Sequence, residues 1–100
     1  MESGVQKLFR KLVMRKYPMY LDVHVIPYVE GSLRYDNPFN RKRYEVILVI
    51  NEKDFRDDRS GEVVDYVRDI AKYMDAEVMG VYHEVVNDEE WEEMKIDKTP

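Results

Sequence analysis

The stretch that most constrains the fold is 43–51, RYEVILVIN, which holds the longest unbroken apolar run of the chain, the five residues Val46 to Ile50. Alternate side chains of a strand point to opposite faces. One face of this strand therefore carries Tyr44, Val46, Leu48 and Ile50, and the other carries Ile47 and Val49. A strand that is apolar on both faces belongs in the middle of a sheet and needs cover on both sides.

Composition limits what can be built around this strand. A chain of 100 residues, 44% hydrophobic and 37% charged, is expected to fold as a single globular domain spanning residues 1–100. The absence of cysteine excludes disulfides and thiolate sites. No apolar stretch approaches the roughly 18 residues of a membrane span, so we expect a soluble, cytoplasmic protein with no membrane partner. The abundance of charged residues is also typical of thermophiles.

Charge is distributed unevenly along the chain. Residues 1–50 contain nine Lys or Arg against five Asp or Glu, whereas residues 51–100 contain seven against sixteen. The net charge of −5 therefore conceals a basic half and an acidic half. Such a bipolar molecule could attract nucleic acid at one end, a basic partner at the other, or a second copy head to tail.

Periodicity and turn residues predict the order of the elements. The helices are expected at Val5–Val13 and Val63–Met74, with Ser3 capping the first and Asp58 or Ser60 the second. A further capping pattern, from Asn87 to Glu90, is expected to open a short acidic helix. Strands are expected at Tyr20–Val29, at the centre and at Glu77–Val86, with a short extra strand at Ser32–Tyr35. Gly80 marks either a bulge or a close backbone approach in the third of these strands. The fold class is α+β: a small two-layer sandwich with a mixed three- to four-stranded sheet, two main helices and the order α-β-(β)-β-α-β-α.

The apolar stripes indicate which faces are buried. In the first helix the stripe is Val5, Leu8, Phe9, Leu12 and Val13; in the first strand it is Leu21, Val23 and Val25; in the second helix it is Val63, Val67, Ile70, Ala71 and Met74. Only Trp91, Met94 and Ile96, in the acidic and partly flexible segment 87–100, remain to cover the second face of the central strand. Either that segment folds back or another molecule covers the face.

A basic and aromatic loop, 34–44, is the first candidate binding site. It contains Arg34, Tyr35, Phe39, Arg41, Lys42 and Arg43. Rings among cations suit stacked bases and phosphates of single-stranded nucleic acid, where Lys7, Lys11 and Arg15 of the first helix would add phosphate contacts. The same residue types are enriched at protein interfaces, and an ordinary solvated loop is the third interpretation.

Carboxylates and histidines provide weaker candidates. Asp54, Asp57 and Asp58, near Glu62, could hold Mg²⁺ beyond the end of the central strand, but acidic residues are favoured at a helix N-terminus by the helix dipole alone. His24 and His83 lie on different predicted strands without a metal-binding spacing, so we treat them as unrelated. The sequence thus predicts no metal site and no cofactor.

The predicted order of elements is similar to the core of the PD-(D/E)xK nucleases, in which an Asp and a Glu-x-Lys bind metal. Asp36 and Glu45 match the two acidic positions, but Ile47 stands where that family has Lys. The same order occurs in phage tail-completion proteins, which bind neighbouring virion subunits. This similarity implies either a metal-dependent nuclease-like enzyme or a virion-associated structural protein.

The functional hypothesis that follows is a small non-catalytic interaction or assembly protein, of viral or accessory type, that binds a macromolecular partner or itself. The bipolar charge, the loop 34–44 and the lack of catalytic spacings motivate it. A nucleic-acid-binding protein is the first alternative, and a metal-dependent nuclease-like enzyme is the second.

Overall fold

The computed structural model describes residues 4–28 and 42–97. Their elements are α1 (Gly4–Lys16), β1 (Tyr20–Pro27), β2 (Lys42–Asn51), the short 3₁₀ helix η1 (Asp57–Arg59), α2 (Ser60–Tyr73), β3 (Ala76–Val86) and α3 (Asp88–Asp97). The predicted α+β class and the order of its main elements are confirmed. The predicted strand at 32–35 lies outside the described residues. No helix in the described part of the chain is long and apolar enough to cross a bilayer.

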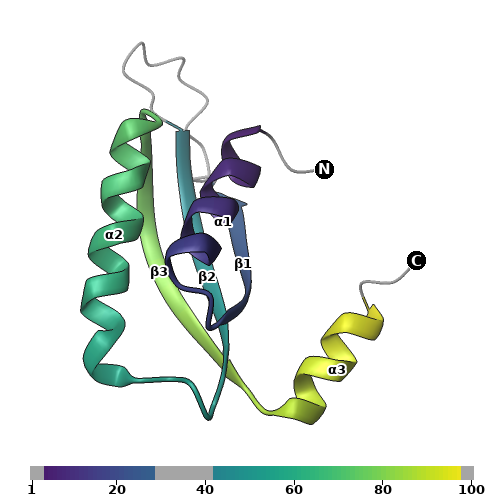
Figure 1. The fold of residues 1–100 in the computed structure, drawn as a ribbon. Coiled ribbons are helices and arrows are strands. Elements are labelled where there is room, and N and C mark those ends of the chain that lie inside the picture. Colours follow the sequence, from purple (N-terminus) through teal and green to yellow (C-terminus); the bar gives the residue numbers. More distant parts are fainter. Residues whose placement is uncertain (1–3, 29–41, 98–100) are drawn as a thin grey trace.

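The central strand of the prediction, β2, does lie in the middle of the sheet. Within the described residues the strand order is β1-β2-β3, with β1 antiparallel to β2 and β2 parallel to β3. The parallel pair is joined through α2, as a crossover connection requires. Figure 1 shows α1 and α2 on the same side of the sheet, with α1 packed on β1 and α2 on β3.

The core lies between these two helices and the sheet. Phe9 and Val13 of α1, Val46 and Leu48 of β2, and Val67 of α2 are each 0% exposed. Burying one such side chain stabilises the fold by about 1.5–3 kcal/mol. The face of β2 that carries Val46 and Leu48 is therefore the one that holds the domain together.

Two bulges decide which side chains reach that face. Between Tyr20 and Asp22 the pairing with β2 shifts by one residue, so Tyr20, rather than Leu21, joins Val23 and Val25 in the core. The predicted alternation is therefore wrong at its first member. A second shift, in β3 opposite the Tyr44–Glu45 step, occurs at the predicted Gly80.

The predicted apolar stripe of α1 is confirmed except at Leu8: Phe9 and Val13 are buried, and Val5 and Leu12 are partly buried against the core. The buried residues of this helix are Gln6, Phe9 and Val13, whereas Leu8, expected in the core, is 46% exposed. The amide of Gln6 donates a 2.7 Å hydrogen bond to the carbonyl oxygen of Val25. This bond satisfies a buried polar side chain and turns Leu8 toward solvent.

The ends of the other helices differ in how well they were predicted. Neither Asp58 nor Ser60 caps α2: its N-cap is Arg59, without a side-chain bond, because η1 precedes the helix and the Ser60 hydroxyl donates to the Asp57 carbonyl. The capping box of α3 is confirmed. The Asn87 amide donates to a Glu90 carboxylate oxygen at 3.0 Å, and the Glu90 amide donates to the Asn87 side-chain oxygen at 2.7 Å.

Candidate functional site

The face of the sheet opposite α1 and α2, which we name the open face, is the largest candidate surface. Strand pairing places His24, Ile47 and Tyr82 in one row across the three strands, and Asp22, Val49 and Glu84 in the next. Figure 1 shows neither α1 nor α2 on this side. The open face is therefore the second apolar side of β2 that the sequence predicts to need cover.

The centre of the open face presents apolar surface to solvent. Tyr82 is 54% exposed and Ile26 is 42% exposed, while Ile47, the β2 partner of Tyr82, is half-buried. The Tyr82 ring leans back over Gly80, where an added Cβ would lie only 2.5 Å from the Tyr82 hydroxyl. The missing side chain of Gly80 thus lets the tyrosine lie flat on the sheet.

Helix α3 does not close this face. It is fixed at the end of β2, where the Asn51 amide donates a 2.6 Å bond to the Asp88 carboxylate, and Lys53 donates to the same carboxylate at 3.1 Å. These two bonds lower the pKa of Asp88, that to Lys53 most. Beyond this anchor α3 extends away from the sheet and makes few contacts with other elements. Val49 and Val86 are buried near the anchor, but the centre of the face stays exposed.

The charge of the open face is negative. Among the described strand residues, Asp22, Glu45, Glu77 and Glu84 lie on it, and Arg43 is the one Lys or Arg. The Arg43 guanidinium is 3.5 Å from Glu77, and Asp22 is 3.7 Å from His24. The remaining carboxylates give the exposed apolar patch an acidic surround.

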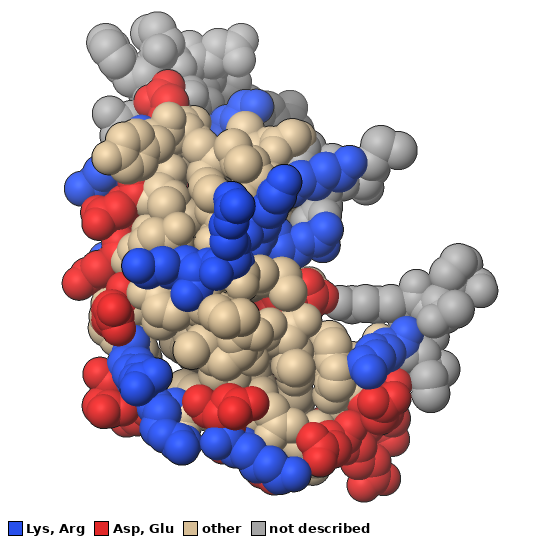
Figure 2. Space-filling model, viewed as in Figure 1, with Lys and Arg blue, Asp and Glu red and all other residues tan. Residues whose placement is uncertain are grey.

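The outward side of α1, which we name the basic face, has the opposite character. Lys7, Lys11 and Arg15 are spaced four residues apart and form one exposed line along the helix, with the exposed Leu8 beside it. The 13 residues of α1 include no carboxylate at all. Figure 2 shows their cationic side chains gathered over α1, while the acidic side chains collect on α2 and α3.

The predicted binding loop is only partly described. Residues 34, 35, 39 and 41 lie outside the described residues, so the grouping of Arg34, Tyr35, Phe39 and Arg41 stays a prediction. Lys42 and Arg43 begin β2, with Lys42 exposed and Arg43 half-buried on the open face. Arg43 therefore lies at the end of the open face where β2 begins.

The carboxylate and histidine candidates do not converge. Among the described residues no group of three or more His, Asp or Glu side chains is placed to hold a metal ion, so Asp54, Asp57 and Asp58 form no ligand set. His24 lies on the open face, whereas His83 pairs with Leu48 on the helix-covered face. Glu45 is on the open face, and its predicted nuclease partner Asp36 is outside the described residues.

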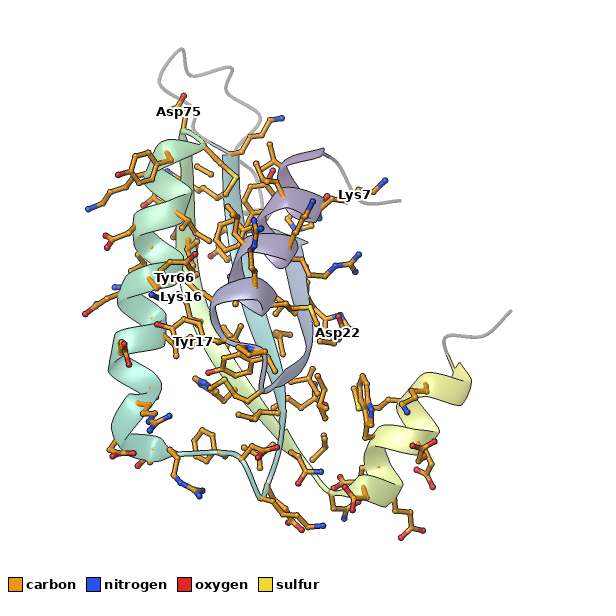
Figure 3. The ribbon with its side chains drawn as sticks, viewed as in Figure 1. Lys7, Lys16, Tyr17, Asp22, Tyr66 and Asp75 are labelled. Atoms are coloured by element: carbon orange, nitrogen blue, oxygen red, sulfur yellow. The ribbon has the colours of Figure 1, made fainter. Side chains whose placement is uncertain are left out.

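His83 instead belongs to an aromatic row that the sequence did not reveal. Successive ring centroids are 5.6 Å apart for Tyr66–Tyr17, 6.1 Å for Tyr17–Tyr20, 5.7 Å for Tyr20–His83 and 5.3 Å for His83–Phe55. Figure 3 shows Tyr17 and Tyr66 meeting between α1 and α2. These rings come from five separate segments, so only the register of the strands could have predicted the row.

A hydrogen bond fixes the middle of this row. The Tyr20 hydroxyl and His83 Nε2 are 2.8 Å apart. Burial raises the pKa of Tyr20 to about 12, with a smaller contribution from Tyr17. Burial lowers the pKa of His83, against an opposing effect of Asp57. Both groups are therefore neutral near pH 7, so the hydrogen-bonded pair adds no charge to the covered face.

Comparison of the chain with protein-family models, curated proteins and solved structures finds no match.

Proposed function

We propose that this chain is an assembly protein that binds a second copy of itself, the basic face of α1 docking on the open face of the next molecule. The observation that carries the proposal is that one molecule has two complementary surfaces. The open face is acidic and apolar and no helix covers it, whereas the basic face of α1 is cationic and has Leu8 exposed. Opposite charges bring the surfaces together, and burial of Leu8 against Ile47 and Tyr82 supplies the apolar contact.

The charge of α3 also argues against this helix covering the open face of its own molecule. Helix α3 contains Asp88, Glu89, Glu90, Glu92, Glu93 and Asp97 against the single Lys95. Folding it across an acidic sheet face would bring like charges together, which costs free energy at short range. A cationic surface meets no such penalty, and α1 is the described helix with cations and no carboxylates.

The two surfaces lie on opposite sides of the sandwich. A contact between them is heterologous, because each molecule uses a different surface from the one its neighbour uses. In an open stack, one basic face and one open face stay unpaired at the two ends, so further molecules can add. If the rotation between neighbours closes, the molecules form a ring with no unpaired face.

Sedimentation velocity over a concentration series tests this function. We expect assembly at low salt that weakens at high salt, because the exposed charges are screened. Tyr82→Glu on the open face should keep the chain monomeric. The matched control is Tyr73→Glu on α2, where the native ring is 91% exposed and lies on neither surface. A strictly monomeric parent chain at low salt, or equal assembly by both variants, would contradict the proposal.

Nucleic-acid binding is the second candidate, because the line of Lys7, Lys11 and Arg15 also matches a row of phosphates. Fluorescence anisotropy with labelled single-stranded DNA and RNA separates the two. Steeply salt-dependent binding, lost in Lys7→Gln/Lys11→Gln and unchanged in Tyr82→Glu, would favour nucleic acid. No binding at low salt would remove this candidate.

A further inference from the structure

A cavity of about 430 Å³ opens between the end of α1, the end of β2 and the start of α2. This volume lies within the range of about 300–1,000 Å³ that is usual for small-molecule sites. The cavity is beyond the carboxyl end of β2, the strand that runs parallel to β3. Ligands of α/β sheets bind preferentially in the crevice at that end. It is separate from the open face, which lies across the sheet.

One wall of the cavity is aromatic and preorganised. Tyr17, Tyr20 and Phe55 line it. Each belongs to the aromatic row, in which edge-to-face contacts and the bond between Tyr20 and His83 fix the rings. A wall of fixed rings binds a planar aromatic group at a low cost in side-chain entropy.

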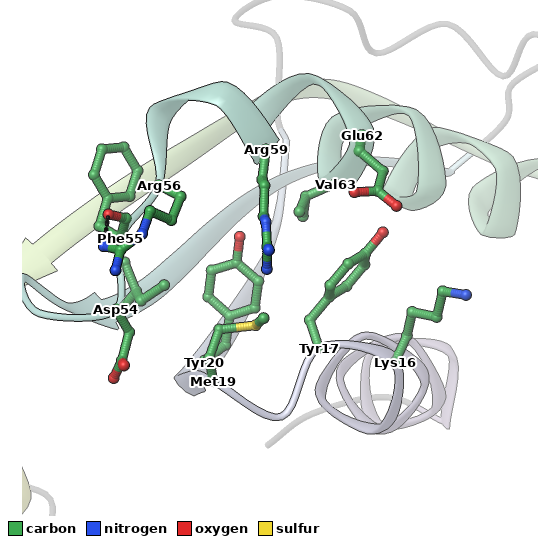
Figure 4. A pocket seen from close by; sticks show the side chains of 11 residues that line it. Lys16, Tyr17, Met19, Tyr20, Asp54, Phe55, Arg56, Arg59, Glu62 and Val63 are labelled. Carbon is green, nitrogen blue, oxygen red and sulfur yellow. Dashed lines mark hydrogen bonds between the residues drawn. The ribbon is translucent and has the colours of Figure 1, made fainter.

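Cationic side chains lie beside these rings in the lining of the cavity. Lys16, Arg56 and Arg59 come from three different segments and all line it. Figure 4 shows Arg59 pointing from the start of α2 toward Tyr17 and Tyr20. Among the described residues the Arg59 side chain has no hydrogen bond or ion pair, although Asp and Glu outnumber Lys and Arg by 21 to 16 in the chain. An arginine without a partner at a cavity is available for an anion from outside.

The two carboxylates of the cavity do not neutralise this cation. Figure 4 shows Asp54 directed away from Arg59, and Glu62 directed at the hydroxyl of Tyr17. Burial raises the pKa of Tyr17, and the charge of Glu62 raises it further. Tyr17 therefore keeps its proton, which suits a hydroxyl that faces a carboxylate.

We propose that this cavity binds an aromatic phosphate of nucleotide size, with the phosphate at Arg59 and the ring against Tyr17, Tyr20 and Phe55. Arginine suits the phosphate because its planar guanidinium forms two parallel bonds to the oxygens. Lys16 and Arg56 add charge at the rim, although the Arg56 guanidinium already donates to the carbonyls of Lys53 and Phe55. The net charge of −5 opposes general attraction of anions, so binding would report the local arrangement.

An NMR titration tests the proposal. The ¹⁵N-labelled 100-residue chain is titrated with AMP and, separately, with phenyl phosphate. We expect saturable shifts at Phe55 and Arg59 with at least one of these probes. Adenosine and inorganic phosphate, which carry one half of the ligand each, should bind about tenfold more weakly or worse. No saturable shift with either aromatic phosphate would overturn the proposal. Equal binding of inorganic phosphate would also overturn it, because the rings would then contribute nothing.

Two substitutions on the same helical region locate the site. Arg59→Gln removes the exposed cation without touching the core and should weaken the best probe by about tenfold, the usual loss of one charge-assisted pair. Arg68→Gln, an exposed position of α2 that does not line the cavity, is the matched control and should bind as the parent does. Unchanged binding in Arg59→Gln would place the ligand elsewhere and overturn the proposal.

Discussion

The two faces of strand β2 differ in how far the fold buries them. Leu48 points into the layer covered by α1 and α2 and is 0% exposed, whereas its neighbour Ile47 points to the open face and is only half-buried. Both are aliphatic residues of the same size, and the β-branched Ile47 has the higher strand propensity, so propensity does not explain the difference. The difference shows that an apolar strand pattern alone does not predict which face of the strand is buried. In this fold α1 and α2 both pack on one face, so the other face stays exposed.

Substituting each neighbour in turn should give the largest effect. Leu48→Ala should lower the free energy of unfolding by about 2–5 kcal/mol, because it leaves a cavity in a packed core. Ile47→Ala should cost about 1 kcal/mol or less, because less apolar surface was removed from water. Urea denaturation at low protein concentration measures both. Equal losses would mean that the open face is as well covered as the core.

A smaller effect is expected where α1 is fixed to β1. Gln6→Ala removes the donor to the Val25 carbonyl and should cost about 1–3 kcal/mol, because a buried acceptor loses its partner. Lys11→Ala, on the exposed side of the same helix, is the control and should change stability by no more than about 0.5 kcal/mol. A neutral Gln6→Ala in the same urea assay would contradict the account of how α1 is oriented.

The covered face should also respond to pH through His83. Burial lowers the pKa of His83 from 6.5, so the unfolded chain binds the proton more readily than the folded one. Its contribution to stability is complete above pH 6.5 and is lost as the pH falls below that value. Denaturation between pH 8 and pH 5 should therefore show a steeper loss in the parent than in His83→Gln. The parallel variant His24→Gln, on the open face, should retain the steep loss.

The smallest effect on the whole domain is expected from α3. Asn87→Ala breaks the capping box and should weaken the helix by about 0.5–2 kcal/mol. Because α3 extends away from the sheet, this loss should remain local. Hydrogen exchange should accelerate in residues 88–97 while the urea midpoint hardly moves. A large shift of the midpoint would show that α3 supports the sheet after all.

The sequence predicted those parts of the fold that depend on local pattern. The double apolar face of 46–50 predicted a central strand, Gly80 a bulge, and Asn87 with Glu90 a cap, since each of these requires only neighbouring residues. Leu8 was predicted wrongly, because Gln6 takes a buried position of α1 through its bond to a distant strand. Helical periodicity cannot reveal that bond.

The candidate sites were less accessible to sequence reasoning. The sequence predicted that the second face of the central strand needs cover. It did not predict that this face is acidic, because that depends on the strand pairing that brings Asp22, Glu45 and Glu84 together. The contact between Tyr20 and His83 depends on two bulges and the register of three strands. One residue of slip would move His83 to the other face. Arg59 was not among the predicted site residues, because only the fold brings it to the rings.

The central claim is that two different surfaces of this chain bind each other, and a mixing experiment tests it most directly. Lys7→Glu/Lys11→Glu leaves the open face intact, while Ile47→Glu/Tyr82→Glu leaves the basic face intact. In sedimentation velocity we expect each variant alone to be monomeric, and their mixture to form a one-to-one pair that grows no further, because one working surface remains on each molecule. A mixture that stays monomeric, or a first variant that still dimerises by itself, would contradict the account.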